Sequence, residues 1–117
     1  MMNANKRKGD RAERAVRDHL ALTFPTKKTR AGFDDDLGDV IAETPRGLFT
    51  FQVKDVASPP WKTWWEQLAS QVTNLRSNTE KAVRGGAIVH KVRGQGTAGR
   101  WRVVMELDQF IELLNEE

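Results

Sequence analysis

The 117-residue sequence predicts a single α/β domain in which helices flank a mixed central sheet. Two segments, 10–23 and 61–82, carry apolar residues at three- and four-residue spacing, as amphipathic helices do. The stretch LFTFQVKD, residues 48–55, alternates apolar and polar side chains with the period of two that a half-buried strand requires. No repeat, low-complexity tract or linker divides the chain. We therefore expect one domain over residues 1–117.

The first half of the chain predicts one helix followed by three strands. The helix covers 10–23 and ends before Pro25. Its expected buried stripe consists of Ala12, Ala15, Val16, His19 and Leu20. A short strand at 26–30 leads into the loop AGFDDD, and LGDVIAE, residues 37–43, forms the second strand. LFTFQVKD is the third.

The motif TPRG joins the second and third strands and predicts a tight hairpin turn, with proline in its second position and glycine in its fourth. A turn centred on this motif pairs Ile41 with Thr50 and Asp39 with Gln52. Directly opposed residues project to the same face of a sheet, about 5 Å apart. Asp39, Gln52 and Lys54 are therefore expected to converge on one face.

The second half predicts a long helix, two strands and a short closing helix. SPPW stops the third strand, and Thr63 with Glu66 has the spacing of a capping box at the start of the long helix. GGAIVHKV, residues 85–92, and RWRVVME, residues 100–106, are typical of strands. A last helix at 107–115 carries Phe110, Ile111 and Leu114. The expected order of elements is α-β-β-β-α-β-β-α.

The long helix has an apolar stripe rich in tryptophan. Its members are Trp61, Trp64, Trp65, Leu68, Val72, Leu75 and Ala82. This spacing favours packing against the core over stacking on nucleobases, although stacking is the functional alternative. Gln67, Gln71 and Asn74 are expected on the adjacent polar face.

Composition excludes several classes of protein. With no cysteine, the chain has no disulfide framework, thiolate zinc site or cysteine nucleophile. No apolar run approaches the length that spans a membrane, and the basic start MMNANKRKGD is not followed by the apolar region of a signal peptide. We expect a soluble cytoplasmic protein, associated with a nucleoid or encoded by a virus, without a membrane partner.

The net charge of +3 conceals charge blocks. Residues 1–30 hold nine Lys or Arg against three acids, and residues 76–104 hold seven against one. Residues 31–43 and 105–117 each hold five acids and no Lys or Arg. Basic blocks suit a polyanion, because neutralised phosphates release counterions; solubility alone is the alternative explanation.

Two features that resemble functional motifs are better explained by structure. GQGTAG, residues 94–99, matches G-x-G-x-x-G but leads into a strand rather than a helix, which predicts a hairpin loop. Arg93 and Arg100 beside this loop are candidates for contact with a DNA backbone. His19 and His90 have no ligand-spaced partner, so we interpret both as structural.

The remaining constellation is Glu13, Asp39, Gln52 and Lys54. Cleavage of a phosphodiester requires a hard cation held by oxygen ligands, which neutralises developing charge and activates water. Asp39 is the strongest candidate ligand, and the backbone carbonyl of Val53 is a second. Lys54 can orient the attacking water or stabilise hydroxide, and Glu13 can reach the site from the first helix.

These residues resemble the PD-(D/E)xK nuclease superfamily. The resemblance rests on KGDRAERAV, then GDVIA, then FQVKD, whose glutamine comes thirteen residues after the aspartate of GDVIA. Within the superfamily, the order is most similar to that of archaeal-type Holliday junction resolvases. It covers roughly residues 6–56 and implies a restriction-endonuclease-like α-β-β-β-α-β core.

Transferred by position, the resemblance implies four roles. Asp39 is the metal ligand, Lys54 the catalytic lysine, Glu13 the helix carboxylate, and Gln52 occupies the third ligand position. The family pattern usually has an acid where this chain has Gln52, although some restriction-type branches use Gln-x-Lys. An amide keeps one oxygen ligand but removes a charge, so metal affinity should fall unless Glu13 or Asp55 compensates. Gly38 stands where the family has its name-giving proline.

The expected function is a Mg²⁺-dependent endonuclease that hydrolyses DNA phosphodiesters, with Mn²⁺ able to substitute. Family likeness implies four-way junctions as substrate and a homodimer, because symmetric resolution requires two active sites. The expected phosphate contacts nearest the site are Lys6, Arg7, Lys8, Arg11, Lys27, Lys28 and Arg30. The alternatives are a duplex or nicking endonuclease of restriction or repair type and a catalytically silent DNA-binding module. We interpret the aspartates at 34–36 as a solvated loop, with a second metal site as the alternative.

Overall fold

A computed structural model describes residues 4–28 and 36–115, with side chains for 7–27 and 36–115. Within these ranges the predicted order of elements is confirmed, with a single 3₁₀ turn added. The elements are α1 Ala4–Ala21, β1 Thr26–Lys28, β2 Val40–Thr44, β3 Gly47–Lys54, α2 Trp61–Ser77, β4 Val83–His90, η1 Ala98–Arg100, β5 Arg102–Val104 and α3 Leu107–Asn115. None of the helices in the described part of the chain has the length and apolar character to cross a membrane.

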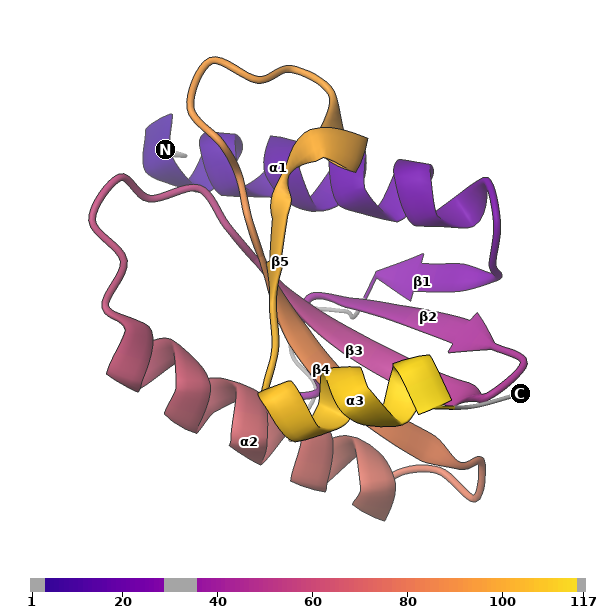
Figure 1. The fold of residues 1–117 in the computed structure, drawn as a ribbon. Coiled ribbons are helices and arrows are strands. Elements are labelled where there is room, and N and C mark those ends of the chain that lie inside the picture. Colours follow the sequence, from indigo (N-terminus) through magenta and orange to yellow (C-terminus); the bar gives the residue numbers. More distant parts are fainter. Residues whose placement is uncertain (1–3, 29–35, 116–117) are drawn as a thin grey trace.

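The five strands form one mixed sheet in the order β1-β2-β3-β4-β5 (Figure 1). Only β3 and β4 are parallel; the other neighbours are antiparallel. The predicted hairpin register is confirmed, because Ile41 pairs with Thr50 and Val40 with Phe51. Thr44 pairs with Gly47, so the turn has only two central residues. The last strand pair also confirms the predicted hairpin around residues 94–99.

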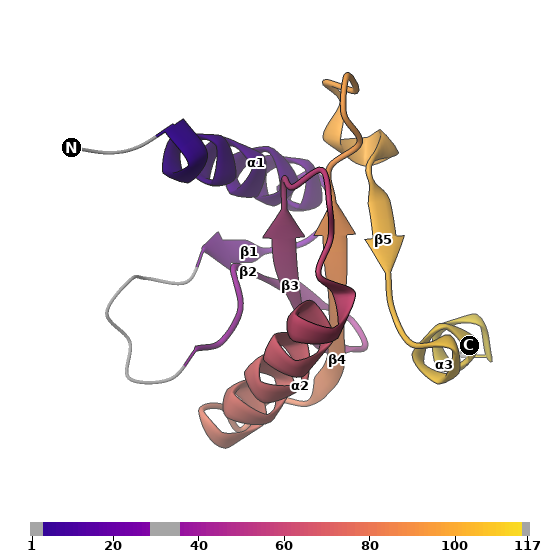
Figure 2. The same ribbon diagram turned by 90° about the vertical axis from the view of Figure 1, so that its left-hand side faces the viewer.

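The first two helices cover opposite faces of the sheet (Figure 2). Ala12 and Val16 of α1 pack against Val53 and its neighbours. On the other face, Trp64 and Leu68 of α2 pack against Ile88. The predicted alternation along β3 is therefore present, but both of its faces are covered, and its polar face is buried rather than exposed to solvent.

Four local expectations are corrected. The first helix begins at Ala4 rather than Asp10, since the lysines, arginines and alanine around Gly9 are strong helix formers that outweigh one glycine. The capping box is absent: Pro60 occupies the N-cap of α2, which places Thr63 inside the helix. His19 is exposed rather than part of the buried stripe. Ala82 is also exposed and lies beyond the end of α2.

The third helix is attached at the edge of β4. β5 pairs only with Ile88–His90, and beyond it the side-chain amide of Gln109 bonds both backbone groups of Gly86. The Arg46 guanidinium donates to the Leu113 carbonyl and connects α3 to the β2–β3 turn. The helix is thus held by its polar side rather than by its apolar stripe.

Candidate active site

The position of Asp39 is set by a short segment that precedes β2. Asp36 Oδ1 accepts the Gly38 amide at 3.0 Å, and the Thr50 hydroxyl donates to the Leu37 carbonyl. Gly38 has a φ of +98°, a conformation that proline cannot adopt. Glycine at this position therefore has a local structural cause, and β2 begins at Val40 rather than at residue 37 because the turn occupies the residues before it.

The Asp39 carboxylate continues the hydrogen bonding between β2 and β3 beyond the first residue of β2. The Asp39 amide donates to the Phe51 carbonyl at 2.9 Å, and Asp39 Oδ2 accepts the Val53 amide at 2.8 Å. The pKa of Asp39 is raised from its ordinary 3.8 to about 6, chiefly because burial removes water from the carboxylate. The Val53 amide opposes this shift by stabilising the charged form.

Three charged groups act electrostatically on Asp39: the nearby Asp36, which raises its pKa, and one group each from α1 and β3. The negative charge of Glu13 on α1 raises the pKa of Asp39, and the positive charge of Lys54 at the end of β3 lowers it. Three predicted site residues are thus brought close enough to interact. Asp55 lies beside them but forms ion pairs with Lys8 at 3.7 Å and Lys91 at 3.6 Å.

Gln52 is the fourth predicted residue, and it belongs to a buried chain of amides. Its side chain is 1% exposed, and its Nε2 donates to Gln71 Oε1 at 2.8 Å. Gln71 Nε2 in turn donates to Asp36 Oδ2 at 2.8 Å. The Asp36 carboxylate can only accept hydrogen bonds, so Gln71 directs its nitrogen toward Asp36 and its oxygen toward Gln52. Gln52 in turn directs its nitrogen toward Gln71, which leaves its Oε1 on the side away from Gln71. Among the described residues, that oxygen is buried without a hydrogen-bond partner.

These groups supply oxygen donors of three kinds for a hard cation: carboxylate, side-chain amide and backbone carbonyl. Phe51 and Val53 direct their backbone groups toward the β2 edge, so the Val53 carbonyl lies on the edge where Asp39 is. Asp39, Glu13, Gln52 Oε1 and this carbonyl match the oxygen ligands that Mg²⁺ prefers, and an unsatisfied buried oxygen is the feature that such an ion would explain. In residues 4–28 and 36–115, no three His, Cys, Asp or Glu side chains are grouped to hold a metal.

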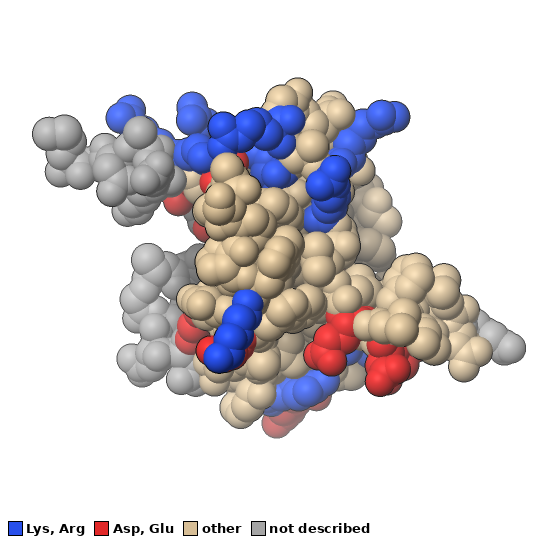
Figure 3. Space-filling view, turned by 60° about the vertical axis from the view of Figure 1, so that its left-hand side comes forward, with Lys and Arg blue, Asp and Glu red and all other residues tan. Residues whose placement is uncertain are grey.

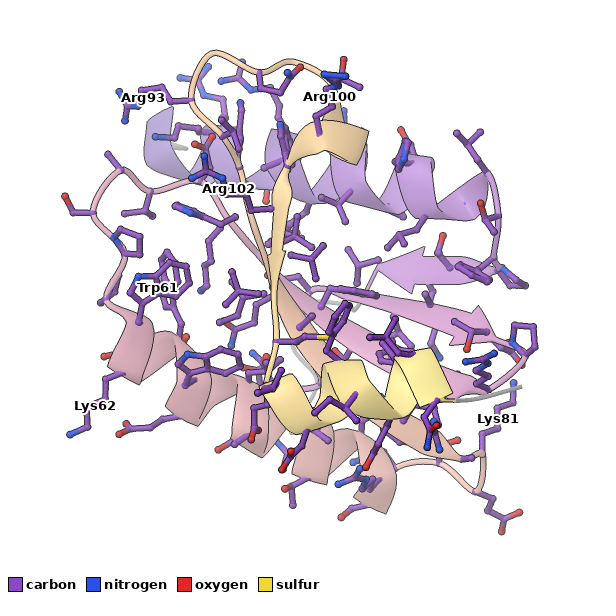
Figure 4. All side chains as sticks on the ribbon, viewed as in Figure 1. Trp61, Lys62, Lys81, Arg93, Arg100 and Arg102 are labelled. Atoms are coloured by element: carbon purple, nitrogen blue, oxygen red, sulfur yellow. The ribbon has the colours of Figure 1, made fainter. Side chains whose placement is uncertain are left out.

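Basic side chains gather at the end of the molecule that carries the site. Figure 3 shows Lys and Arg concentrated at one end, with acidic side chains collected nearer the opposite end. We call this surface the basic end; its exposed arginines are Arg7, Arg11 and Arg14 of α1, Arg93 and Arg100 of the β4–β5 connection, and Arg102 at the start of β5. Figure 4 shows the last three together.

The remaining predicted DNA contacts are distributed differently. Lys8 is half-buried in its ion pair with Asp55. Lys27 lies apart from the basic end, where it lines a hollow of about 240 Å³ with Lys81 and the C-terminal end of α2. Three predicted contacts lie outside the described side chains: Lys6, Lys28 and Arg30. Asp34 and Asp35 do as well, whereas Asp36 belongs to the amide chain.

Sequence reasoning missed Gln71, which was expected on a polar face. Its spacing from Trp64, Leu68 and Leu75 is seven, three and four residues, which places it in the middle of the buried stripe. A polar residue at a core position is the signal that identifies it. The structure also adds Asp36, whose carboxylate ends the chain of amides.

Comparisons of the chain with models of known families, with curated proteins and with solved structures give no match.

Proposed function

We propose that the protein is a metal-dependent endonuclease that hydrolyses DNA phosphodiester bonds, built on a restriction-endonuclease-like α-β-β-β-α-β core. The observation that carries the proposal is the convergence on Asp39 of Glu13 from α1 and Lys54 from β3. A carboxylate whose pKa is raised by burial, beside a lysine and a second carboxylate, is typical of a catalytic centre.

The cation of this site would be Mg²⁺, with Mn²⁺ as a substitute. Asp39, Gln52 Oε1, the Val53 carbonyl and Glu13 would hold it, and the bound ion would supply charge neutralisation at the phosphate. The amide chain from Asp36 through Gln71 holds Gln52 Oε1 in position, so an amide can act where related sites use an acid. Because an amide carries no charge, we expect the affinity of this site for the metal to be lower than that of a site with an acid at this position.

The protein groups have separate roles in hydrolysis. Water attacks phosphorus, one phosphorus–oxygen bond breaks, and the departing oxygen takes up a proton. Lys54 is positioned by β3, with its Nζ 5.4 Å from the centre of the Trp64 ring, to orient the water or a phosphate oxygen. The basic end would bind the DNA backbone on either side of the cleaved bond.

The proposed substrate is branched DNA, and the proposed assembly is a homodimer. The substrate follows from the resemblance of the motifs to junction resolvases. The dimer has support in α3, where Leu107, Phe110, Ile111 and Leu114 form one stripe at helical spacing yet are 47% to 71% exposed. A second apolar feature adjoins this helix, a hollow of about 290 Å³ lined by Phe49, Met105, Leu113 and others.

A second copy is the partner that fits this surface. The stripe exposes roughly 400 Å² of apolar surface, which is the size of the largest patch on an ordinary monomer, often a functional one, and about half of one partner's share of a standard interface. An isologous contact places the same stripe against its copy and can direct each stripe toward the hollow beside the other.

A cleavage assay tests the function directly. Labelled four-way junction, duplex and single strand are incubated with Mg²⁺, Mn²⁺ or EDTA, and the products are separated on gels. Cleavage that requires metal and is lost in Lys54→Ala and Asp39→Ala supports the proposal. Binding without cleavage under every metal condition would overturn it in favour of a silent DNA-binding module.

The same assay separates the two enzymatic alternatives. A duplex or nicking endonuclease cuts plain duplex as fast as it cuts junction, whereas a resolvase cuts junction preferentially and at paired positions. Equal rates on both substrates would remove the branched-DNA part of the proposal and leave the nuclease part standing.

A further inference from the structure

One aromatic side chain near the site is not needed to fill the core. Of the four tryptophans, Trp64 and Trp101 are buried and Trp65 is partly buried, whereas Trp61 is 37% exposed. It is the first residue of α2 and follows the loop that leaves β3. Figure 4 shows it at the end of the molecule where β3 and β4 finish.

The neighbours of Trp61 lie on one side of its ring. Its centroid is 5.2 Å from that of Trp64 and 5.6 Å from that of His90, both nearly perpendicular to it. Trp64 and His90 are themselves 5.7 Å apart, so the three centroids form a nearly equilateral triangle. If these two neighbours stood on opposite sides of Trp61, they would be far more widely separated. The other side of the indole is therefore not used by either of them.

A row of basic side chains crosses the sheet beside this ring. Lys54 on β3 is in register with His90 on β4, and His90 is in register with Arg102 on β5. Residues in register project to the same face, so the row runs across three strands on the α2 side, with about 4.8 Å between strands. The row begins at the proposed catalytic lysine and ends at an exposed arginine of the basic end.

The distance from this ring to the site is short. Lys54 Nζ lies 5.4 Å from the Trp64 ring, whose centroid is 5.2 Å from that of Trp61. Trp61 is thus within about three stacked nucleotides of Lys54 along one strand, at 3.4 Å per nucleotide. Positive side chains beside an exposed indole are the arrangement by which proteins hold single strands, here with phosphates on Lys54 and Arg102 and a base on the ring.

We propose that Trp61 stacks on an unpaired DNA base next to the cleaved phosphodiester, while Arg102 contacts the phosphate backbone of the same strand. The inference rests on the proposed function and adds its substrate class: the enzyme acts where at least one base near the cut is unpaired, as at a fork, a flap or a branch point whose base pairs have opened. A fully paired duplex keeps its bases in the helix and cannot use this ring.

Binding measured in EDTA tests this inference without involving cleavage. Fluorescence anisotropy gives Kd values for a labelled single strand and for a paired duplex of the same length. Trp61→Ala should weaken single-strand binding by about tenfold, as loss of one base stack does, and change duplex binding by less than about twofold. Trp61→Phe should keep most of the affinity. The control Leu22→Ala removes another exposed apolar side chain, at the far end of α1, and should change neither Kd.

The wild-type protein provides an independent measurement should Trp61→Ala fail to fold. Strands with one abasic site at successive positions should lose affinity at one position and bind normally at the others. Equal effects of Trp61→Ala on single strand and duplex, or an abasic series without a sensitive position, would overturn the inference. Metal-dependent cleavage in the gel assay would survive that outcome, so a wrong stacking site and a wrong nuclease function give different results.

Discussion

At the scale of single residues, the site depends on a buried carboxylate whose ionisation is costly. Asp39 has its pKa raised to about 6, so between pH 4 and 6 the folded protein binds a proton that the unfolded chain has released. The corresponding stabilisation is fully present below pH 4 and is lost as the pH rises through 6. Above that pH, ionised Asp39 costs the metal-free fold roughly 3 kcal/mol, since each pKa unit corresponds to about 1.4 kcal/mol.

Asp39→Asn should therefore stabilise the metal-free protein while abolishing cleavage. The amide oxygen can still accept the Val53 amide, but no charge is buried. In EDTA at pH 8, the free energy of unfolding should rise by roughly 1–3 kcal/mol, and at pH 4 it should not change. Urea denaturation at both pH values measures this. Asp18→Asn changes an exposed carboxylate and serves as control; an equal gain at both pH values for Asp39→Asn would contradict the explanation.

The buried hydrogen bond to Gln71 gives residue 52 a structural reason to be an amide. Gln52→Glu would set an acceptor-only carboxylate against Gln71 Oε1, which Asp36 holds in that orientation. We expect a loss of roughly 2–4 kcal/mol in EDTA, because a buried charge is left unpaired, and a larger gain in stability on adding Mg²⁺ than in wild type. Thermal unfolding with and without Mg²⁺ measures both effects. Gln67→Glu, exposed on the same helix, is the matched control; unchanged stability of Gln52→Glu in EDTA would show that the amide chain is not rigid.

At the scale of elements, α2 contributes to the site through Gln71, and its Trp64 ring lies 5.4 Å from Lys54 Nζ. The helix brings Gln71 to the sheet at the same spacing as Leu68 and Leu75, so its packing also orients Gln52 Oε1. The same helix begins with the exposed ring of Trp61. Packing would thus be coupled to the proposed metal ligation and the proposed substrate contact through one helix.

Gln71→Leu should test Gln71 as a positioning residue. The substitution leaves the Gln52 nitrogen and the Asp36 carboxylate without their partner, and we expect a loss of about 1–3 kcal/mol in stability. A purely structural role predicts only that loss. A positioning role also raises the Mg²⁺ concentration needed for half-maximal cleavage, with activity partly restored at high Mg²⁺. Gln67→Leu is the control, and an unchanged Mg²⁺ dependence in Gln71→Leu would reject the positioning role.

Periodicity predicted the existence and order of the elements, whereas their first residues were less predictable. The hairpin register could be predicted from the sequence because the TPRG motif indicates a two-residue turn at one place, and the structure has that turn. Asp39 and Lys54 could be placed together from that register, and Lys54 does act on the Asp39 carboxylate. The burial of Gln52 could not be predicted, because it depends on the packing of α2 against the polar face of β3. The chain of Gln71 and Asp36 is a tertiary contact across 35 residues and has no local signal beyond a polar residue in an apolar stripe.

At the scale of the whole molecule, charge separates one end from the other. The basic end carries Arg93 and Arg100, while Arg76 and Lys81 lie at the opposite end of the sheet, where Lys81 pairs with Glu43 at 2.8 Å. Long-range attraction to DNA should therefore depend on which arginines are removed and not only on the net charge.

Removing Arg93 and Arg100 together should weaken duplex binding and reduce its salt dependence. Each lost phosphate contact lowers the slope of log Kd against log salt by about 0.9, so the double alanine variant should lose up to about two units. Titrations at several salt concentrations in EDTA measure the slope. The double variant Arg76→Ala and Lys81→Ala has the same net charge, and its slope should match that of wild type. Equal slopes for the two double variants would mean that the basic end is not the DNA surface.

The apolar stripe of α3 predicts the state of assembly. Wild type should sediment as a dimer of 13.3 kDa chains at micromolar concentration, and the double variant Phe110→Ser and Leu114→Ser should sediment as a monomer. The fold should survive because neither side chain is buried. Leu22→Ser, another exposed leucine, should leave the dimer intact. A wild-type monomer at tens of micromolar would remove the homodimer from the proposal.

The attachment of α3 through Gln109 also matters for the behaviour of the chain in solution. Because β5 is short, the outer edge of β4 would present free backbone groups around Gly86, and such edges recruit strands from other molecules. The side-chain amide of Gln109 occupies this edge. Its Oε1 accepts the Gly86 amide at 3.2 Å, and its Nε2 donates to the Gly86 carbonyl at 2.9 Å. α3 therefore hinders the pairing of a strand from another molecule with this edge of β4. Loss of the Gln109 side-chain amide would favour insoluble aggregates joined by strand pairing over dimers.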